Sequence, residues 1–362
     1  MNLISRLRPW HISLLLGGLV AFIGVVKYGI GVFPSWIYMY DLSVNWSDPS
    51  ASPILVPPAD YLRSNFVAAW LAGALGFTTV TSHFVFHVLL AILAIILPFL
   101  MPSVRQSAPR ARMMFIAMAG GAVLPVLLLW ANGYDAVTVI GLGFAALCRN
   151  KYVAVSGWFI ATLNHPSVGV VALLAWAVVT LWLHRSSIRA GVGVIALATG
   201  GVVLGGLINS VLMQAWGGST SRLDWFREQS FSDFASGFFL SMPLLFFSSL
   251  GVLWFVLLRP QVFRLGVVRV LIAEAVVLSL VLPWITLDTT RTVVLSLFAA
   301  ILVVVPVVAD HQLTWDWRGM GVVAALVPVP VIWSGALLYG GWESFFNLDT
   351  ALLPPDGYAV LE

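Results

Sequence analysis

Charge is scarce in this sequence, and cysteine is almost absent. Of its 362 residues only 9% are Asp, Glu, Lys or Arg, whereas 60% are hydrophobic; soluble domains carry roughly 25% charged residues. The composition therefore excludes an ordinary soluble protein and indicates a polytopic integral membrane protein. The single cysteine, Cys148, has no second cysteine with which to form a disulfide, so the redox compartment is not indicated.

Several functional signatures are also missing. There is no basic tail and no interleaving of aromatic and basic residues, which excludes a nucleic-acid groove despite the net charge of +3. The sequence has no P-loop, dinucleotide fingerprint, zinc spacing or nucleophile elbow, and we expect no cofactor. His83 and His87 share one helical face without an obvious third ligand, so a divalent metal is not indicated.

Long apolar runs are abundant, and mean hydropathy is +0.99. Because a helix needs about 20 apolar residues to cross a bilayer, we expect an all-α transmembrane bundle of about eleven spans, forming one integral membrane domain over 1–362. The expected spans are 11–31, 80–101, 112–131, 135–148, 152–163, 166–184, 190–213, 236–258, 265–284, 291–309 and 319–341. Two of them, 135–148 and 152–163, are too short to cross alone, which favours a cavity beside them that opens outward.

Charges of opposite sign fall on opposite sides of these spans. The basic side should be cytoplasmic, because loops rich in Lys and Arg are retained there. This pattern predicts a cell (plasma or inner) membrane protein with a cytoplasmic N-terminus and an external C-terminus. The basic side holds Arg6, Arg8, Arg105, Arg110, Arg112, Arg149, Lys151, Arg185, Arg189, Arg259, Arg264, Arg269 and Arg318. The opposite side holds Asp41, Asp48, Asp60, Asp135, Asp224, Glu228, Asp233, Asp288, Glu343, Asp349 and Asp356.

Two long external loops, 32–79 and 214–235, follow from this arrangement. The early part of the first is rich in proline and is expected to be irregular. Its later part, about 60–76, has apolar residues on one helical stripe behind Asp60 as a cap. We expect an amphipathic helix there, lying on the outer membrane surface.

The first external loop carries the strongest candidates for chemistry. Asp41 and Asp48 lie seven residues apart among aromatic side chains. A carboxylate at an apolar edge has a raised pKa and suits a general base, whereas in a wet loop both would be merely solvated. The sequence leaves open which of the two is the base.

Further polar residues interrupt the apolar segments on the same side. Asp135, Asn164 and His165 are candidates for binding sugar hydroxyls, although Asp135 is equally suited to capping a helix and His165 to a structural hydrogen bond. Arg291, beside Asp288, is a candidate for binding phosphate, because arginine binds phosphate in bidentate fashion. An ion pair between them is the structural alternative. Arg222 and Arg227 are the other available phosphate ligands.

The layout resembles that of the GT-C glycosyltransferases. A first helix precedes an external loop with an acidic residue, then a surface helix and a span, and Leu124-Pro125 through Gly133-Tyr134-Asp135 resembles their core. The resemblance covers roughly residues 10–185. It places Asp41 or Asp48 at the catalytic acid, and it implies sugar transfer from a polyprenyl-phosphate donor on the outer face.

We therefore expect a membrane glycosyltransferase whose partners are a polyprenyl-phosphate-linked sugar, a glycan or lipid acceptor from the cell envelope, and membrane lipids. Three alternatives stay open. A transporter or flippase of envelope precursors would use Glu274 with Asp310 or His311 as an inner relay. A polysaccharide polymerase or ligase would depend on arginines more than on an acidic base, and a non-catalytic assembly subunit would need neither.

Overall fold

The computed structural model describes residues 8–31, 36–55, 59–129, 133–218, 231–286, 289–311, 316–333 and 336–339. Nearly all of them are helical, which confirms an all-α membrane protein. Within these residues, six helices are long and apolar enough to cross a membrane: α1 Pro9–Tyr28, α4 Val80–Leu100, α10 Pro166–Leu183, α11 Ile188–Ala215, α16 Gly266–Val281 with η4 Leu282–Trp284, and α17 Thr289–Asp310. The count of about eleven spans stays a prediction.

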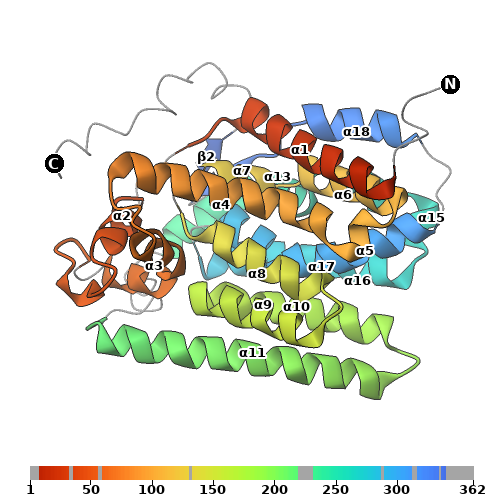
Figure 1. Ribbon diagram of the computed structural model, residues 1–362. Coiled ribbons are helices and arrows are strands. Elements are labelled where there is room, and N and C mark those ends of the chain that lie inside the picture. Colours follow the sequence, from red (N-terminus) through yellow and green to blue (C-terminus); the bar gives the residue numbers. More distant parts are fainter. Residues whose placement is uncertain are drawn as a thin grey trace.

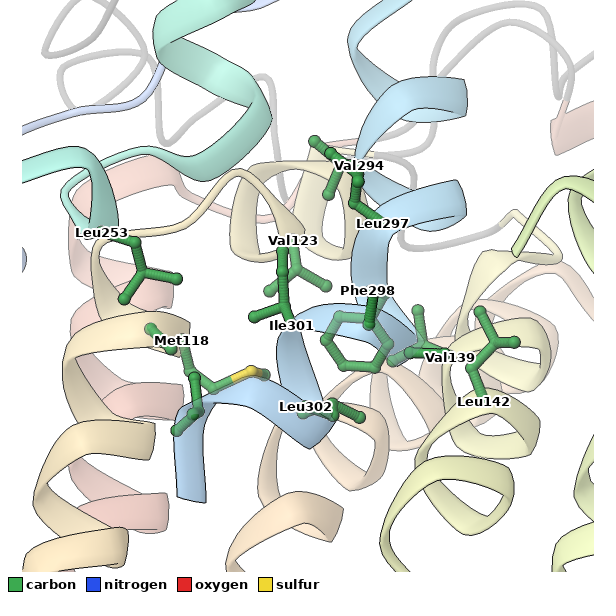
Figure 2. Packing of buried hydrophobic residues seen from close by; sticks show 14 of the residues in the cluster. Met118, Val123, Val139, Leu142, Leu253, Val294, Leu297, Phe298, Ile301 and Leu302 are labelled. Carbon is green, nitrogen blue, oxygen red and sulfur yellow. The ribbon is translucent and has the colours of Figure 1, made fainter. Parts of the chain in front are cut away.

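The long helices run side by side, with α11 along one edge of the bundle (Figure 1). α17 is the central helix, since 67% of its apolar window is buried, compared with 28% for α1 and α11. Figure 2 shows its residues packed between α6 Ala108–Ala119 and α7 Val123–Leu129 on one side and α8 Asp135–Leu147 on the other. The cluster drawn there includes Met118, Val123, Val139, Leu142, Val294, Phe298, Ile301 and Leu302.

The expected span 112–131 is broken. α6 Ala108–Ala119 and α7 Val123–Leu129 meet at 55°. At the break the buried Lys27 Nζ donates to the oxygen of Ala119 at 3.2 Å, and Val252 N donates to that of Gly120 at 2.8 Å. These donors satisfy carbonyls that a helix end leaves without partners.

Two short helices form a tight hairpin. α8 and α9 Lys151–Asn164 are 13 and 14 residues long, close to the expected 135–148 and 152–163. A Cβ at Gly157 would come within 2.5 Å of the oxygen of Gly141, so the two backbones touch. α11 also packs closely on the other side of α9, since a Cβ at Gly201 of α11 would lie 2.7 Å from Val155 O.

The segment expected to be an irregular loop and a surface helix is a compact helical cap at one end of the bundle (Figure 1). It comprises α2 Trp36–Val44, η2 Pro49–Ala51, η3 Ala59–Asn65 and α3 Val67–Ala74. The continuous helix over 60–76 is wrong, because it divides at Phe66, and much of α3 is buried rather than lying on a surface. The cap has its own apolar core of Met39, Leu42, Leu55, Leu62, Phe66 and Ala69, which also includes Tyr134.

The expected final span over 319–341 is also wrong. α18 Trp317–Leu326 ends before Pro328 and Pro330, and β1 Val331–Trp333 then pairs antiparallel with β2 Ala336–Tyr339. Proline cannot continue a helix, because it lacks an N–H and clashes with the preceding turn. Protein groups satisfy the non-helical backbone, as an apolar setting requires; for example, Ile332 N donates to Thr290 Oγ1 at 3.0 Å.

The remaining helices of the described residues are α5 Pro102–Arg105, α13 Phe231–Leu250, α14 Leu253–Leu257 and α15 Pro260–Phe263. α5 and α15 lie at the end of the bundle opposite the cap (Figure 1). Arg110 pairs there with Asp310 at 2.6 Å, and the Arg112 guanidinium lies 4.4 Å from the ring centre of Trp317. Arg110 and Arg112, both predicted to lie on the cytoplasmic side, are therefore found away from the cap.

Candidate functional site

The two carboxylates proposed as the base lie in different environments. Asp41, on α2, is 8% exposed and accepts hydrogen bonds from Ser52 Oγ and, at 3.2 Å, from Asn45 Nδ2. Burial raises the pKa of this carboxyl, while the hydroxyl of Ser52, the charge of Arg63 and the amide of Asn45 act against the rise. The Asp41 carboxylate therefore accepts a proton at a higher pH than an ordinary aspartate does.

Asp48 is exposed and has a local structural role. Its Oδ1 accepts from the backbone N of Ser50 at 3.2 Å and from the Ser50 hydroxyl, which caps η2. A solvated capping carboxylate is a weaker base candidate than a buried one, so the structure separates two residues that the sequence left equivalent.

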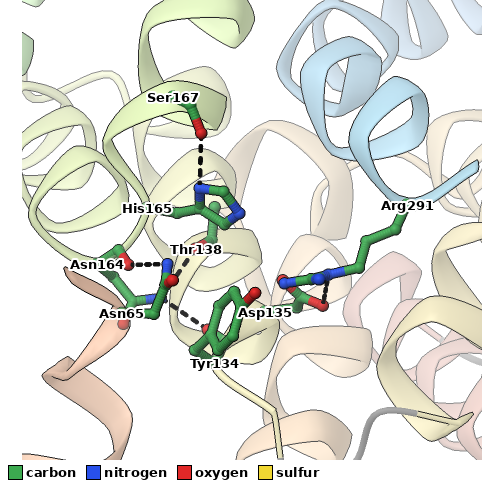
Figure 3. A network of polar contacts seen from close by, with 8 residues as sticks. All are labelled: Asn65, Tyr134, Asp135, Thr138, Asn164, His165, Ser167 and Arg291. Atoms are coloured by element: carbon green, nitrogen blue, oxygen red, sulfur yellow. Dashed lines mark hydrogen bonds and ion pairs between the residues drawn. The ribbon is translucent and has the colours of Figure 1, made fainter. Parts of the chain in front are cut away.

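Asp135 and Arg291 form a buried, bidentate ion pair (Figure 3). Arg291 Nε and Nη2 donate to the two carboxylate oxygens of Asp135 at 2.5 and 2.9 Å. Asp135 is the first residue of α8, where a carboxylate also favours the helix dipole, and Arg291 lies in the first turn of α17. The pair therefore joins two helix starts that are 156 residues apart in the sequence.

Tyr134 lies at the centre of the same network. The centre of its ring lies 4.4 Å from the Arg291 guanidinium and 5.4 Å from the centre of the His165 ring. Its backbone oxygen accepts from Asn164 Nδ2 at 2.7 Å. Four of the candidate residues (Asp135, Asn164, His165 and Arg291) are thereby brought together around one tyrosine.

Asn164, at the end of α9, is completely buried. Its Nδ2 also donates to Thr138 Oγ1 at 2.9 Å, but its Oδ1 has no hydrogen-bond partner among the described residues. A buried acceptor of this kind is suited to a hydroxyl donor. His165 is 3% exposed, and its Nδ1 lies 3.3 Å from Ser167 Oγ.

Three residues that the sequence did not single out attach the cap to α9 and α11, and one of them, Asn65, reaches this network directly. Asn65 Nδ2 donates to Asn164 O at 2.8 Å, and Arg63 Nη1 donates to Trp216 O at 2.8 Å. Asn209 Nδ2 donates to the oxygens of Ser64 and Leu163, each at 2.7 Å. The available signal for Asn209 was an amide within an apolar span, because such polar groups are rare and face protein.

Of the remaining candidates, the structure describes Asp41 and Asp48. Asp41 belongs to the cap and interacts electrostatically with Arg63, two residues before Asn65. Asp288, Arg222 and Arg227 lie outside the described residues. Arg291 pairs with Asp135, a residue distant in sequence, and an ion pair between Asp288 and Arg291 stays a prediction.

His83 and His87 are buried beneath the cap. Their ring centres are 4.1 Å apart, and the ring of Tyr40 packs edge-on against His83. In the part of the chain that the structure describes, no three His, Cys, Asp or Glu side chains gather as metal ligands.

Comparisons with family models, with curated proteins and with solved structures each give no match for this chain.

Proposed function

We propose that this chain is a membrane glycosyltransferase that moves a sugar from a polyprenyl-phosphate donor to a cell-envelope acceptor on the outer face of the membrane. The observation that carries the proposal is Asp41, a buried carboxylate whose pKa is raised by burial. It lies in a cap that is hydrogen-bonded through Asn65 to the buried polar network of Asn164 and Tyr134.

Asp41 removes the proton of the acceptor hydroxyl as its oxygen bonds to the anomeric carbon of the donor sugar. The bond between that carbon and the phosphate oxygen breaks, and polyprenyl phosphate leaves. Asn164 Oδ1, which is buried and has no described partner, accepts from a sugar hydroxyl, with His165 beside it.

The structure changes the part that we assign to Arg291. Because its charge is already neutralised by Asp135, this pair holds Tyr134 and the starts of α8 and α17 in position. We therefore assign stabilisation of the charge on the leaving phosphate to Arg222 and Arg227, since positioned cations stabilise charge that develops in a transition state.

Asp41→Asn tests the base. Purified protein in liposomes receives radiolabelled polyprenyl-phosphate hexoses, with envelope glycan as acceptor, and transfer to the glycan is counted. We expect Asp41→Asn to lose about 10²-fold or more of the activity, the usual contribution of a positioned base. Asp48→Asn removes an equal charge from the same cap and should stay near wild type. Full activity in Asp41→Asn would make the mechanism wrong.

The pH profile gives a second measure of the same residue. The base must be ionised, so activity falls as pH drops through the pKa of Asp41. Ser52→Ala removes a hydrogen bond that lowers this pKa, so the acidic limb should move to higher pH. Ser50→Ala, which affects Asp48 instead, should leave the limb in place.

One observation favours a flippase as the second candidate. Glu274 lies within α16, and neither of its buried oxygens has a hydrogen-bond partner among the described residues; carboxylates inside spans often mark transport paths. Movement of a lipid-linked sugar across sealed vesicles without covalent change, lost in Glu274→Gln, would support this function over transfer.

A further inference from the structure

A cavity of about 670 Å³ lies at the end of the bundle opposite the cap, between the start of α1 and the corner where α4 meets α5. Its volume is within the range of roughly 300–1,000 Å³ typical of small-molecule sites. The residues that line it are Arg8, Pro9, Trp10, Leu14, Phe99, Leu100, Arg105 and Gln106.

The floor of this cavity is apolar and fixed. Ser13 Oγ donates to the oxygen of Phe99 at 2.7 Å, which ties α1 to the end of α4. A Cβ at Gly17 would lie 3.1 Å from the Phe99 ring, so the glycine permits this close approach. Trp10 and Leu14, one helical turn apart, remain 44% and 40% exposed beside the buried Phe99.

The rim is polar and carries one sign of charge. Arg8 and Arg105 are exposed at the mouth with Gln106, and the lining residues that the structure describes include no carboxylate. The cavity lies where one apolar span begins and another ends, at the depth of the membrane surface, and tryptophan is enriched at that depth. An occupant must therefore be anionic at its head and apolar along its tail.

We propose that this cavity binds one anionic diacyl phospholipid. Arg8 and Arg105 hold the headgroup phosphate, and an acyl chain lies against Trp10, Leu14 and Phe99. Basic sites between membrane helices bind anionic headgroups for the same electrostatic reason. The site is remote from the cap and independent of the proposed transfer reaction.

The test is native mass spectrometry of the full-length protein, titrated with phosphatidylglycerol or with phosphatidylcholine of the same acyl chains. Wild type should retain phosphatidylglycerol preferentially. Arg8→Ala with Arg105→Ala should weaken retention roughly tenfold or more, because each arginine near the surface attracts anionic lipid. The matched control, Arg185→Ala with Arg189→Ala, removes two exposed arginines that are not lining residues and should have no effect.

Leu14→Trp fills the cavity while keeping both arginines, and it should also reduce retention. Equal retention of the two lipids by wild type would overturn the proposal. So would an equal loss in the two double variants, or displacement of the bound lipid by inorganic phosphate alone, which would indicate a free-anion site. A thermal melt of each variant confirms that the protein is folded when it is measured.

Discussion

At the scale of single residues, Asp135 and Arg291 are so deeply buried that each charge depends on the other to offset its desolvation cost. Their side chains are 1% and 6% exposed, so removing one partner leaves the other as a desolvated charge without its ion-pair partner. Replacing both is far less harmful, because the desolvation of both groups disappears with the attraction between them.

We therefore expect Asp135→Asn and Arg291→Met each to cost about 3–5 kcal/mol of unfolding free energy, and the double variant to recover most of that loss. Unfolding in mixed detergent measures the cycle. The exposed pair Arg110–Asp310 is the control, because surface pairs contribute about 0–1 kcal/mol. Additive losses at Asp135 and Arg291 would show that the two charges are not coupled.

The sequence identified most members of this network but not their contacts. Asp135, Asn164, His165 and Arg291 stand out as polar residues between apolar runs. For Arg291 the sequence suggested phosphate or its near neighbour Asp288, and it could not indicate the contact with Asp135, which comes from another helix. Tyr134 could not be singled out, because interfacial tyrosines are common and its role depends on packing against Arg291.

At the scale of helices, the contact between α8 and α9 sets the position of the site. Asp135 begins α8 and Asn164 ends α9, and the two helices touch through Gly141 and Gly157. Spreading this hairpin would move both residues relative to Arg291.

Gly157→Ala should destabilise the protein by about 1–3 kcal/mol, the usual cost of overpacking, because its Cβ would come within 2.5 Å of Gly141 O. Gly200→Ala is the control, since a Cβ there meets nothing within 4 Å and alanine favours the helix. Thermal melts compare the two. Equal stability of the two variants would contradict a close backbone contact.

The helix boundaries that the sequence predicted well have local causes. Pro166 begins α10, and the start at Val80 follows the cap of Thr79. The failures have non-local causes. The span over 319–341 was predicted from an apolar run that includes Pro328 and Pro330. Hydropathy measures transfer into lipid and not helical geometry, so it does not register the two prolines. The cap helices depend on their mutual packing around a shared apolar core.

At the scale of the whole molecule, the separation of charge expected from the sequence has a structural counterpart. The buried Asp41 and the Asp135–Arg291 pair lie at or beside the cap, and the arginines of α5 and α6 lie at the other end. A transferase working on the outer face requires the cap to be outside. The orientation is therefore the premise on which the proposed chemistry depends.

Cysteine labelling tests this premise in a Cys148→Ser background. Ala51→Cys lies exposed in the cap, and Ser186→Cys lies exposed between α10 and α11. Because arginine-rich loops are retained in the cytoplasm, a membrane-impermeant maleimide should label Ala51→Cys in intact cells and Ser186→Cys after permeabilisation. The reverse pattern would place the cap and Asp41 in the cytoplasm, and a transfer reaction on the outer face would then be ruled out whatever the activity of Asp41→Asn.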